Sequence, residues 1–142
     1  PIQWQRRLRN IAYLPKRSLV KRFMDDVIQP AMTLVQEELN KQGTLSHIND
    51  AADDRLRLEF DLGNERNFIY EVRLRGYNSP TFALAAMDND EQQAEQHRYY
   101  RAEVYLKEGG QNYDVMGWNQ EQLINDILDQ YEKHLHFLHL VR

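Results

Sequence analysis

The stretch "RLRLEFDLGNERNFIYEVRL", residues 55 to 74, decides the fold because apolar and polar residues alternate through both of its halves. Alternation of this kind is typical of a strand with one buried and one solvated face. "GNER", residues 63 to 66, places turn-forming residues between the halves. The sequence therefore predicts a β-hairpin whose buried face carries Leu56, Leu58, Phe60, Leu62, Phe68, Tyr70, Val72 and Leu74.

Further strands are expected on both sides of this hairpin. Residues 44 to 48 form a possible short strand before it, and residues 81 to 86 a possible third strand after it. "DNDEQQAEQ", residues 88 to 96, is acidic and lacks periodicity, which indicates a mobile loop. "EGGQN", residues 108 to 112, is expected to turn the chain into a short strand around Tyr113 to Met116. That turn follows a strand that alternates through Tyr100, Ala102, Val104 and Leu106.

A long helix is predicted before the strands, from about Arg17 to Gln42. Its apolar residues recur at spacings of three and four, as on one face of a helix. Ser18 is a plausible N-cap and Gly43 a plausible residue just beyond the C-terminus. Pro30 lacks the N–H that would bond the carbonyl of Asp26, so we expect a kink between these two residues.

A second helix is predicted at the end of the chain, where Asn119 and Gln122 have the spacing of a capping box. The fold class is therefore α+β: a kinked N-terminal helix, an antiparallel meander of about four to six strands and a C-terminal helix. Both helices are expected on one face of the sheet. Residues 1–16 are interpreted as a basic arm and residues 17–142 as a single domain.

Length and composition limit the possible functions. The chain has 142 residues, enough for one domain with a substantial core. It has no cysteine, which excludes disulfides, cysteine-ligated zinc sites and thiol nucleophiles. Its longest apolar run, residues 82 to 87, is far shorter than the roughly 20 residues that span a membrane. Because the first residue is Pro1, we expect a fragment or a processed product.

Charge is distributed unevenly along the chain. The net charge is −4, but residues 1 to 22 contain no acid, and residues 23 to 142 carry 11 basic against 22 acidic side chains. A basic segment of this kind can bind nucleic acid, an anionic membrane face or the acidic body itself. The seven basic residues of the segment are Arg6, Arg7, Arg9, Lys16, Arg17, Lys21 and Arg22.

The arm also has an amphipathic pattern. Trp4, Leu8 and Ile11 are spaced as on one face of a helix, with arginines between them. A short helix in a membrane interface has this pattern, with its aromatic ring at headgroup level. The alternative is an arm whose Trp4 packs on the domain.

Three of the five histidines lie in "ILDQYEKHLHFLHL", residues 127 to 140. Projected on a helix, His134 falls within the apolar arc and His136 on the opposite, solvated side. Glu132, His136 and His139 form only a weak candidate for a surface zinc site, because such sites need three or four convergent ligands. A solvated helix stripe is the favoured interpretation, and neither a metal nor a catalytic centre is predicted.

Enzyme signatures are absent from the sequence. There is no glycine-rich phosphate loop, no G-x-S-x-G and no H-E-x-x-H. The acidic body argues against nucleic acid as a partner, because phosphates would be repelled. We therefore expect a non-enzymatic module without a cofactor.

Four blocks of the sequence carry a resemblance to a known family. They are "QPAM" at residues 29 to 32, "NFIYEV" at 67 to 72, "YYRAEVYLKEGG" at 99 to 110, and "DILDQYEKHL" at 126 to 135 within a stretch that begins at Tyr113. Together they resemble BCCT (betaine/choline/carnitine) transporters, specifically BetT-type choline transporters with a long C-terminal extension. The residues expected to be structural in this pattern are Pro30, Tyr113, Asp126, Ile127, Leu128, Asp129, Tyr131 and Leu135.

The resemblance implies a cytoplasmic C-terminal domain of a proton- or sodium-coupled choline transporter in the bacterial inner membrane. Its role would be to regulate uptake according to osmotic conditions, with the imported choline feeding glycine betaine synthesis. The implied partner is the transmembrane domain of the same chain. Anionic lipid of the inner leaflet is a possible contact for Trp4 and the basic residues, since cytoplasmic flanks of membrane spans are rich in Lys and Arg. A passive structural or oligomerisation extension, and a small-molecule or ion sensor, stay open as alternatives.

Overall fold

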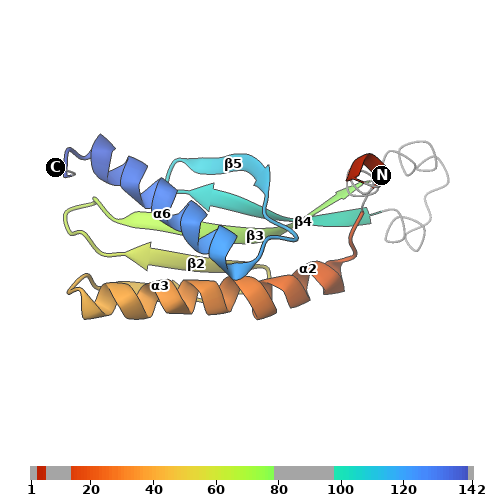
Figure 1. The fold of residues 1–142 in the computed structure, drawn as a ribbon, viewed down its shortest axis with the longest axis horizontal. Helices are drawn as coiled ribbons and strands as arrows, with labels where there is room; N and C mark the ends of the chain where they lie inside the picture. Colours follow the sequence, from red (N-terminus) through yellow and green to blue (C-terminus); the bar gives the residue numbers. More distant parts are fainter. Residues whose placement is uncertain (1–2, 6–13, 79–97, 141–142) are drawn as a thin grey trace.

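The computed structural model describes residues 3–5, 14–78 and 98–140. Two helical stretches and a C-terminal helix accompany one sheet, and the two termini lie at opposite ends of the molecule (Figure 1). The elements are α2 (Arg17–Phe23), a π-helical segment η1 (Met24–Ile28), α3 (Gln29–Lys41), β1 (Ser46–Asn49), β2 (Arg55–Phe60), β3 (Phe68–Asn78), β4 (Arg98–Leu106), β5 (Gly109–Asp114) and α6 (Gln120–Phe137).

The five strands form one antiparallel sheet in the order β1-β2-β3-β4-β5. The predicted hairpin is confirmed as β2 and β3, with Leu58 opposite Tyr70. On the other side of β3, Val72 lies opposite Val104 of β4. Because side chains alternate along a strand and pair across neighbours, this register places the apolar positions of β2, β3 and β4 on one face.

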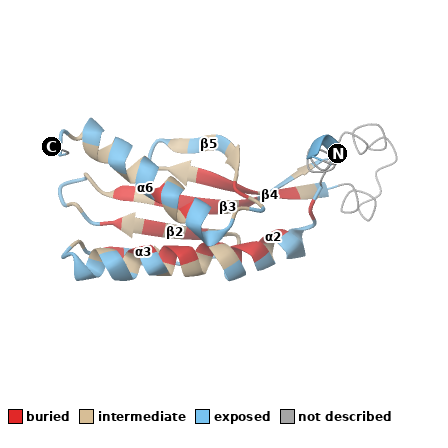
Figure 2. Ribbon diagram, viewed as in Figure 1, coloured by how far each residue is buried: buried red, intermediate tan, exposed pale blue. Residues whose placement is uncertain are grey.

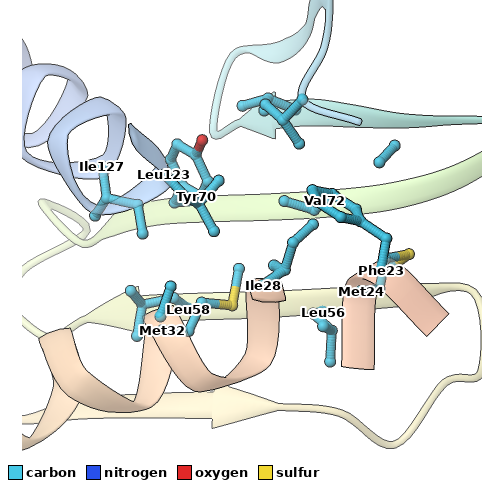
Figure 3. Packing of buried hydrophobic residues seen from close by; sticks show 14 of the residues in the cluster. Phe23, Met24, Ile28, Met32, Leu56, Leu58, Tyr70, Val72, Leu123 and Ile127 are labelled. Carbon is cyan, nitrogen blue, oxygen red and sulfur yellow. The ribbon is translucent and has the colours of Figure 1, made fainter. Parts of the chain in front are cut away.

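Both helical elements cover that face, as the fold class predicted. The core is one cluster that joins the apolar sheet positions to the helices, for example Met24, Ile28 and Met32 from the first helix and Leu123 and Ile127 from α6. Figure 3 shows these side chains pointing between the helices and the sheet. Figure 2 shows buried residues along the strands and along the inner side of α2 and α3.

The long N-terminal helix differs from the prediction at its first residues. It begins at Arg17 with Lys16 as the N-cap residue, and no side chain caps it, so the assignment of Ser18 as N-cap was wrong. Where the kink was expected, the helix is irregular: the π-helical segment η1 ends at Ile28, two residues before Pro30, and the N–H of Gln29 bonds the carbonyl of Met24. A π-segment of this kind adds one residue to a helical turn, and it lies where Pro30 has no N–H to continue the regular hydrogen bonds of the helix. Gly43 follows the helix with φ of 90°, as expected.

The strand boundaries also needed correction. The strand expected at residues 44–48 is β1, which begins two residues later at Ser46. The turn after β4 consists of Lys107 and Glu108 alone, so "GGQN" belongs to β5 rather than to a loop, and the expected strand from Tyr113 to Met116 was placed too late. The strand at 81–86 and the mobile loop at 88–96 lie outside the described residues.

The outer face of the sheet carries two buried acids that alternation does not predict. Glu71 is 2% exposed, with Arg57 and Arg73 on either side forming ion pairs to its two oxygens. Glu103 is 8% exposed and accepts 2.7 Å hydrogen bonds from the hydroxyl of Tyr77. These carboxylates are paired by cations and a phenol from neighbouring strand positions, which makes their burial tolerable.

Candidate functional site

The corner between β5 and α6, residues 113 to 119, is stabilised by hydrogen bonds to backbone N–H groups. Asp114 Oδ1 accepts hydrogen bonds from the backbone N–H groups of Ala102 (3.0 Å) and Met116 (2.9 Å). The N–H of Trp118 donates to the carbonyl of Val115 at 3.0 Å. Gly117 has φ of 88°, a conformation that favours glycine. The corner is thus a defined turn, stabilised by these hydrogen bonds and by the backbone conformation of Gly117.

Asn119 then starts α6 with the predicted capping box. Its side chain accepts from the N–H of Gln122 at 2.8 Å, and the side chain of Gln122 accepts from the N–H of Asn119 at 2.9 Å. Two N–H groups at the helix start are thereby satisfied reciprocally. This cap fixes the direction in which α6 leaves the corner.

Asp126 ties the corner to the centre of the sheet. Its Oδ2 accepts hydrogen bonds from the hydroxyls of Tyr70 and Tyr113, both at 2.6 Å. Burial, and then the bond to Asp126, raises the pKa of both tyrosines well above the ordinary value of 10.0. Both hydroxyls therefore remain protonated near neutral pH and serve as hydrogen-bond donors, not as acids or bases.

A cavity of about 590 Å³ lies between this corner and the start of the long helix. The ring of Trp118 forms part of its wall and stacks on Tyr113, with ring centroids 6.2 Å apart and an interplanar angle of 16°. Because Asp126 holds Tyr113, it also supports the position of Trp118 indirectly. The cavity is lined by Pro15, Leu19, Asp114, Met116, Gly117, Trp118 and Gln122.

The other wall of this cavity is where the basic arm joins the domain. Pro15 is buried, and its carbonyl accepts a 2.9 Å hydrogen bond from the N–H of Tyr100 at the start of β4. Leu19, on the first turn of α2, is 37% exposed. The arm therefore reaches the sheet at a fixed point beside the corner.

The structure brings part of the predicted basic segment onto the acidic body. Arg17 Nη2 lies 2.7 Å from Asp53 Oδ2, and Lys21 Nζ lies 2.9 Å from Asp25 and 3.6 Å from Asp53. The hydrogen bond from Arg17 lowers the pKa of Asp53 below its ordinary value. The contact with the body, one of the three partners left open by the sequence, is thus present for these two cations.

The other basic residues of the segment lie at the surface or outside the described part of the chain. Lys16 and Arg22 are exposed, and Arg6, Arg7 and Arg9 lie outside the described residues. Trp4 is 65% exposed, which does not favour the alternative that it packs into the domain. A lipid contact for these residues stays a prediction.

The histidines near the C-terminus have different surroundings. His134 Nε2 is 2.8 Å from the carbonyl oxygen of Arg66, and its ring is 5.5 Å from that of Phe68. His136 is on the solvated side, 3.9 Å from Glu132. Among the described residues no group of three His, Asp or Glu side chains could hold a metal ion, so the weak candidate Glu132, His136 and His139 is not assembled.

The other residues quoted for the family resemblance occupy different environments. Ile127 is fully buried, and Tyr131 packs edge-on against Phe60 with ring centroids 4.7 Å apart. Leu135 is half-buried and Asp129 is exposed. Leu128 is 48% exposed and lines an apolar groove between α3 and α6, together with Leu34.

Three residues of the cavity wall are candidates that hydrophobic periodicity does not identify. Asp114 and Trp118 belong to the run "YDVMGW", residues 113 to 118, in which a polar residue and a glycine interrupt the apolar ones. That interruption is the available sequence signal for a structured corner. Leu19 has no such signal, because its role depends on the packing of α2 beside the corner.

Comparisons with known proteins identify relatives but no family model that matches. The chain is 41% identical over its whole length to a glycine betaine transporter of Acinetobacter baylyi. It is 35% identical over 99% of its length to the high-affinity choline transport protein of Escherichia coli K12, and 34% identical to the osmo-dependent choline transporter BetT2 of A. baylyi.

The match covers all of this chain but only 21% of each of these relatives. Within the described residues, no helix has both the length and the apolar character needed to cross a membrane. The predicted resemblance is confirmed as homology to glycine betaine and choline transporters, whereas the position of this segment within such a protein stays a prediction. This chain is homologous, from end to end, to a segment that makes up about a fifth of proteins known as glycine betaine and choline transporters.

Proposed function

We propose that the chain is the cytoplasmic C-terminal regulatory domain of a choline transporter, which adjusts choline import for glycine betaine synthesis to osmotic conditions. The observation that carries this proposal is the end-to-end match to transporters, one of them described as osmo-dependent. The segment would regulate uptake through its position relative to the transporter, not through catalysis. Its partner would be the transmembrane domain of the same chain, in the inner membrane.

The charge distribution supports an electrostatic mechanism. Cations that follow a last membrane span face an anionic leaflet, and each contributes on the order of 1 kcal/mol of attraction. That attraction is screened over about 8 Å at physiological ionic strength. Rising internal salt would therefore weaken the hold of residues 6 to 22 on lipid and shift the domain relative to the transporter.

The ion pairs at the start of α2 compete with lipid for two of these cations. Asp53 is 69% exposed and pairs with Arg17 and Lys21, two of the cations that would otherwise face lipid. Exposed pairs of this kind are weak, about 0–1 kcal/mol each, so they can exchange with lipid at little cost. The proposed switch is thus between an arm held by the acidic body and an arm held by the membrane.

Choline uptake by the intact transporter tests the regulatory role. We expect the response of uptake to hyperosmotic shock to disappear when this segment is removed, and to weaken when Arg6, Arg7 and Arg9 are changed to Gln. The substitutions leave the domain in place, so they separate a loss of regulation from a loss of folding. An unchanged osmotic response in the truncated carrier contradicts the proposal.

A second candidate function is a structural extension that holds copies of the transporter together. The apolar groove between α3 and α6 favours it, since Leu34 and Leu128 are 50% and 48% exposed there. Exposed apolar surface of this kind marks interaction sites when it is contiguous. Sedimentation of the 142-residue chain with and without Leu34→Glu tests it: self-association that the substitution abolishes supports this role.

A further inference from the structure

An apolar groove of about 270 Å³ lies between α3 and α6, which diverge from the start of α6 towards its C-terminus (Figure 1). Leu34 of α3 and Leu128 of α6 form part of its walls and are 50% and 48% exposed. The other apolar residues that line it are Val35, Leu39, Ile124 and Tyr131. The two exposed leucines therefore belong to contiguous apolar surface, the kind that marks interaction sites.

The floor of this groove is part of the hydrophobic core. Val35 is buried, and the ring of Tyr131 packs edge-on against Phe60 with ring centroids 4.7 Å apart. Leu39 and Ile124 also pack against the core cluster. Because these side chains are already fixed in place, a partner can bind the groove without the cost of first ordering it.

Carboxylates flank the apolar residues on both helices. Glu38 lines the groove itself, four residues after Leu34. On α6, Glu121 precedes Leu128 by seven residues and Glu132 follows it by four. Residues four or seven positions apart lie on the same side of a helix, and all three glutamates are exposed. The groove thus combines an apolar floor with anionic rims.

Two neighbouring groups offset part of this negative charge. Lys41, three residues after Glu38, is exposed on α3. His136 Nε2 lies 3.9 Å from Glu132 and offsets its charge only when the ring is protonated. The amide of Gln42 donates a 3.1 Å hydrogen bond to Glu38, which leaves the charge of that carboxylate in place. Three glutamates against one lysine make these surroundings of the groove anionic.

These features select among possible occupants. A lipid tail or another apolar molecule would bury the leucines but make no use of the carboxylates. A second copy packed groove to groove would bring three more glutamates into the same contact, and like charges repel across an interface. A helix with one apolar face and Lys or Arg beside it suits both the leucines and the glutamates.

We propose that the groove between α3 and α6 binds a basic amphipathic helix of a polypeptide partner. Its apolar stripe would pack on Leu34 and Leu128, and its cations would face the three glutamates. Helices bind grooves of this kind through apolar residues spaced by three and four positions. The inference goes beyond the proposed function, because the electrostatic mechanism uses residues 6 to 22 and does not involve this groove.

A designed peptide tests the proposal on the 142-residue chain. The probe is an alanine-rich peptide of about 18 residues, with leucines spaced by three and four positions and lysines on both sides of this stripe. Calorimetric titration should show saturable binding. A peptide of the same composition, with its leucines spread around the helix, should bind at least about tenfold more weakly. Equal affinities of the two peptides, or no saturation, would overturn the proposal.

Three leucines of similar exposure provide matched variants. Leu34→Gln and Leu128→Gln remove apolar surface from the groove. Leu14, which is 46% exposed and precedes α2 at the other end of the long helix, is the control as Leu14→Gln. Each groove variant should weaken binding of the peptide by at least about tenfold, whereas the control should leave the affinity unchanged. If all three variants bind alike, the peptide does not occupy the groove.

The contribution of the glutamates is tested by salt. Glu121→Gln combined with Glu132→Gln should weaken binding by about three- to tenfold at low ionic strength and should reduce its salt dependence. Asp26→Asn combined with Glu108→Gln changes the net charge equally at two exposed positions outside the groove and is the control. Equal losses in both double variants would contradict the assigned role of the rims.

Sedimentation separates a peptide partner from a second copy. A chain that stays monomeric and binds the peptide supports the proposal. If the chain instead forms a dimer that Leu128→Gln dissociates and that the peptide leaves intact, a second copy occupies the groove and the proposal is wrong. Removal of the segment from the transporter reports on regulation alone, so either result of the peptide titration is distinguishable from the outcome for the proposed function.

Discussion

The hydroxyl of Tyr70, near the start of β3, donates a 2.6 Å hydrogen bond to Oδ2 of Asp126 on α6, 56 residues away. The same oxygen accepts from Tyr113 of β5. Two of the stretches that carry the family resemblance, one with Tyr70 and the other with Tyr113 and Asp126, therefore meet at one carboxylate. Bonds between a phenol and an ionised acid are among the stronger hydrogen bonds in proteins, so this contact fixes α6 against the sheet.

Removing this carboxylate should destabilise the domain. In Asp126→Ala the hydroxyl of Tyr70, a fully buried residue, loses its acceptor. A buried donor left without a partner costs about 1–3 kcal/mol, and the half-buried hydroxyl of Tyr113 adds to it, so we expect a loss of about 2–3 kcal/mol. Urea denaturation followed by circular dichroism measures it.

Asp129→Ala is the control for this variant. Asp129 lies one turn further along α6 and is exposed, so its removal should change the free energy of unfolding by less than about 0.5 kcal/mol. If the two variants lose equal stability, the bonds to Tyr70 and Tyr113 do not hold α6 to the sheet.

Alkaline pH should act on the same contact. Burial raises the pKa of Tyr70 above its ordinary 10.0, so the folded state holds this proton more tightly than the unfolded state does. The resulting stability is complete below about pH 10 and is lost as pH rises towards the folded pKa, by about 1.4 kcal/mol per pH unit for one group. Thermal unfolding of the native chain and of Tyr70→Phe between pH 8 and 11 compares the slopes. We expect parallel curves below pH 9 and a steeper fall of the native chain above pH 10; a common slope throughout contradicts the assignment.

The elements of this fold are largely accessible from the sequence because they depend on local patterns. Alternation through residues 55 to 74 predicts β2 and β3, since each buried position is two residues from the next. Asn119 and Gln122 predict the start of α6 because a capping box needs only a fixed spacing. The buried Glu71 shows the limit: it is polar in an alternating strand, so the pattern assigns it to solvent, whereas Arg57 and Arg73 enclose it.

The candidate site depends instead on contacts between distant segments. Arg17 and Asp53 are 36 residues apart, and only the position of α2 beside the turn that precedes β2 brings them together. The cavity likewise forms between Leu19 and Trp118, which no spacing rule connects. The charge distribution predicts that the basic arm binds an acidic partner, but it does not predict which carboxylate pairs with it.

The corner itself can be tested through its glycine. A Cβ at Gly117 would meet no atom within 4 Å, but φ of 88° is a conformation that other residues rarely adopt. Gly117→Ala should therefore cost about 1–2 kcal/mol through the backbone alone. Urea denaturation measures the loss, and a shifted fluorescence maximum of Trp118 in the Trp4→Phe background would report a moved corner. A variant as stable as the native chain would show that the corner does not need this conformation.

Release of the basic segment from the body should strengthen its attraction to lipid. Asp53→Asn removes the partner of Arg17 and the more distant partner of Lys21. We expect tighter binding of the 142-residue chain to vesicles containing anionic phosphatidylglycerol, by up to about fivefold, which corresponds to roughly 1 kcal/mol for a cation near an anionic surface. Co-sedimentation at several salt concentrations measures it, and the difference should shrink as salt rises. Glu37→Gln, an exposed site on α3, changes the net charge equally and is the control. If both variants bind alike, overall charge rather than the freed Arg17 explains the effect, and the exchange between acidic body and membrane is excluded.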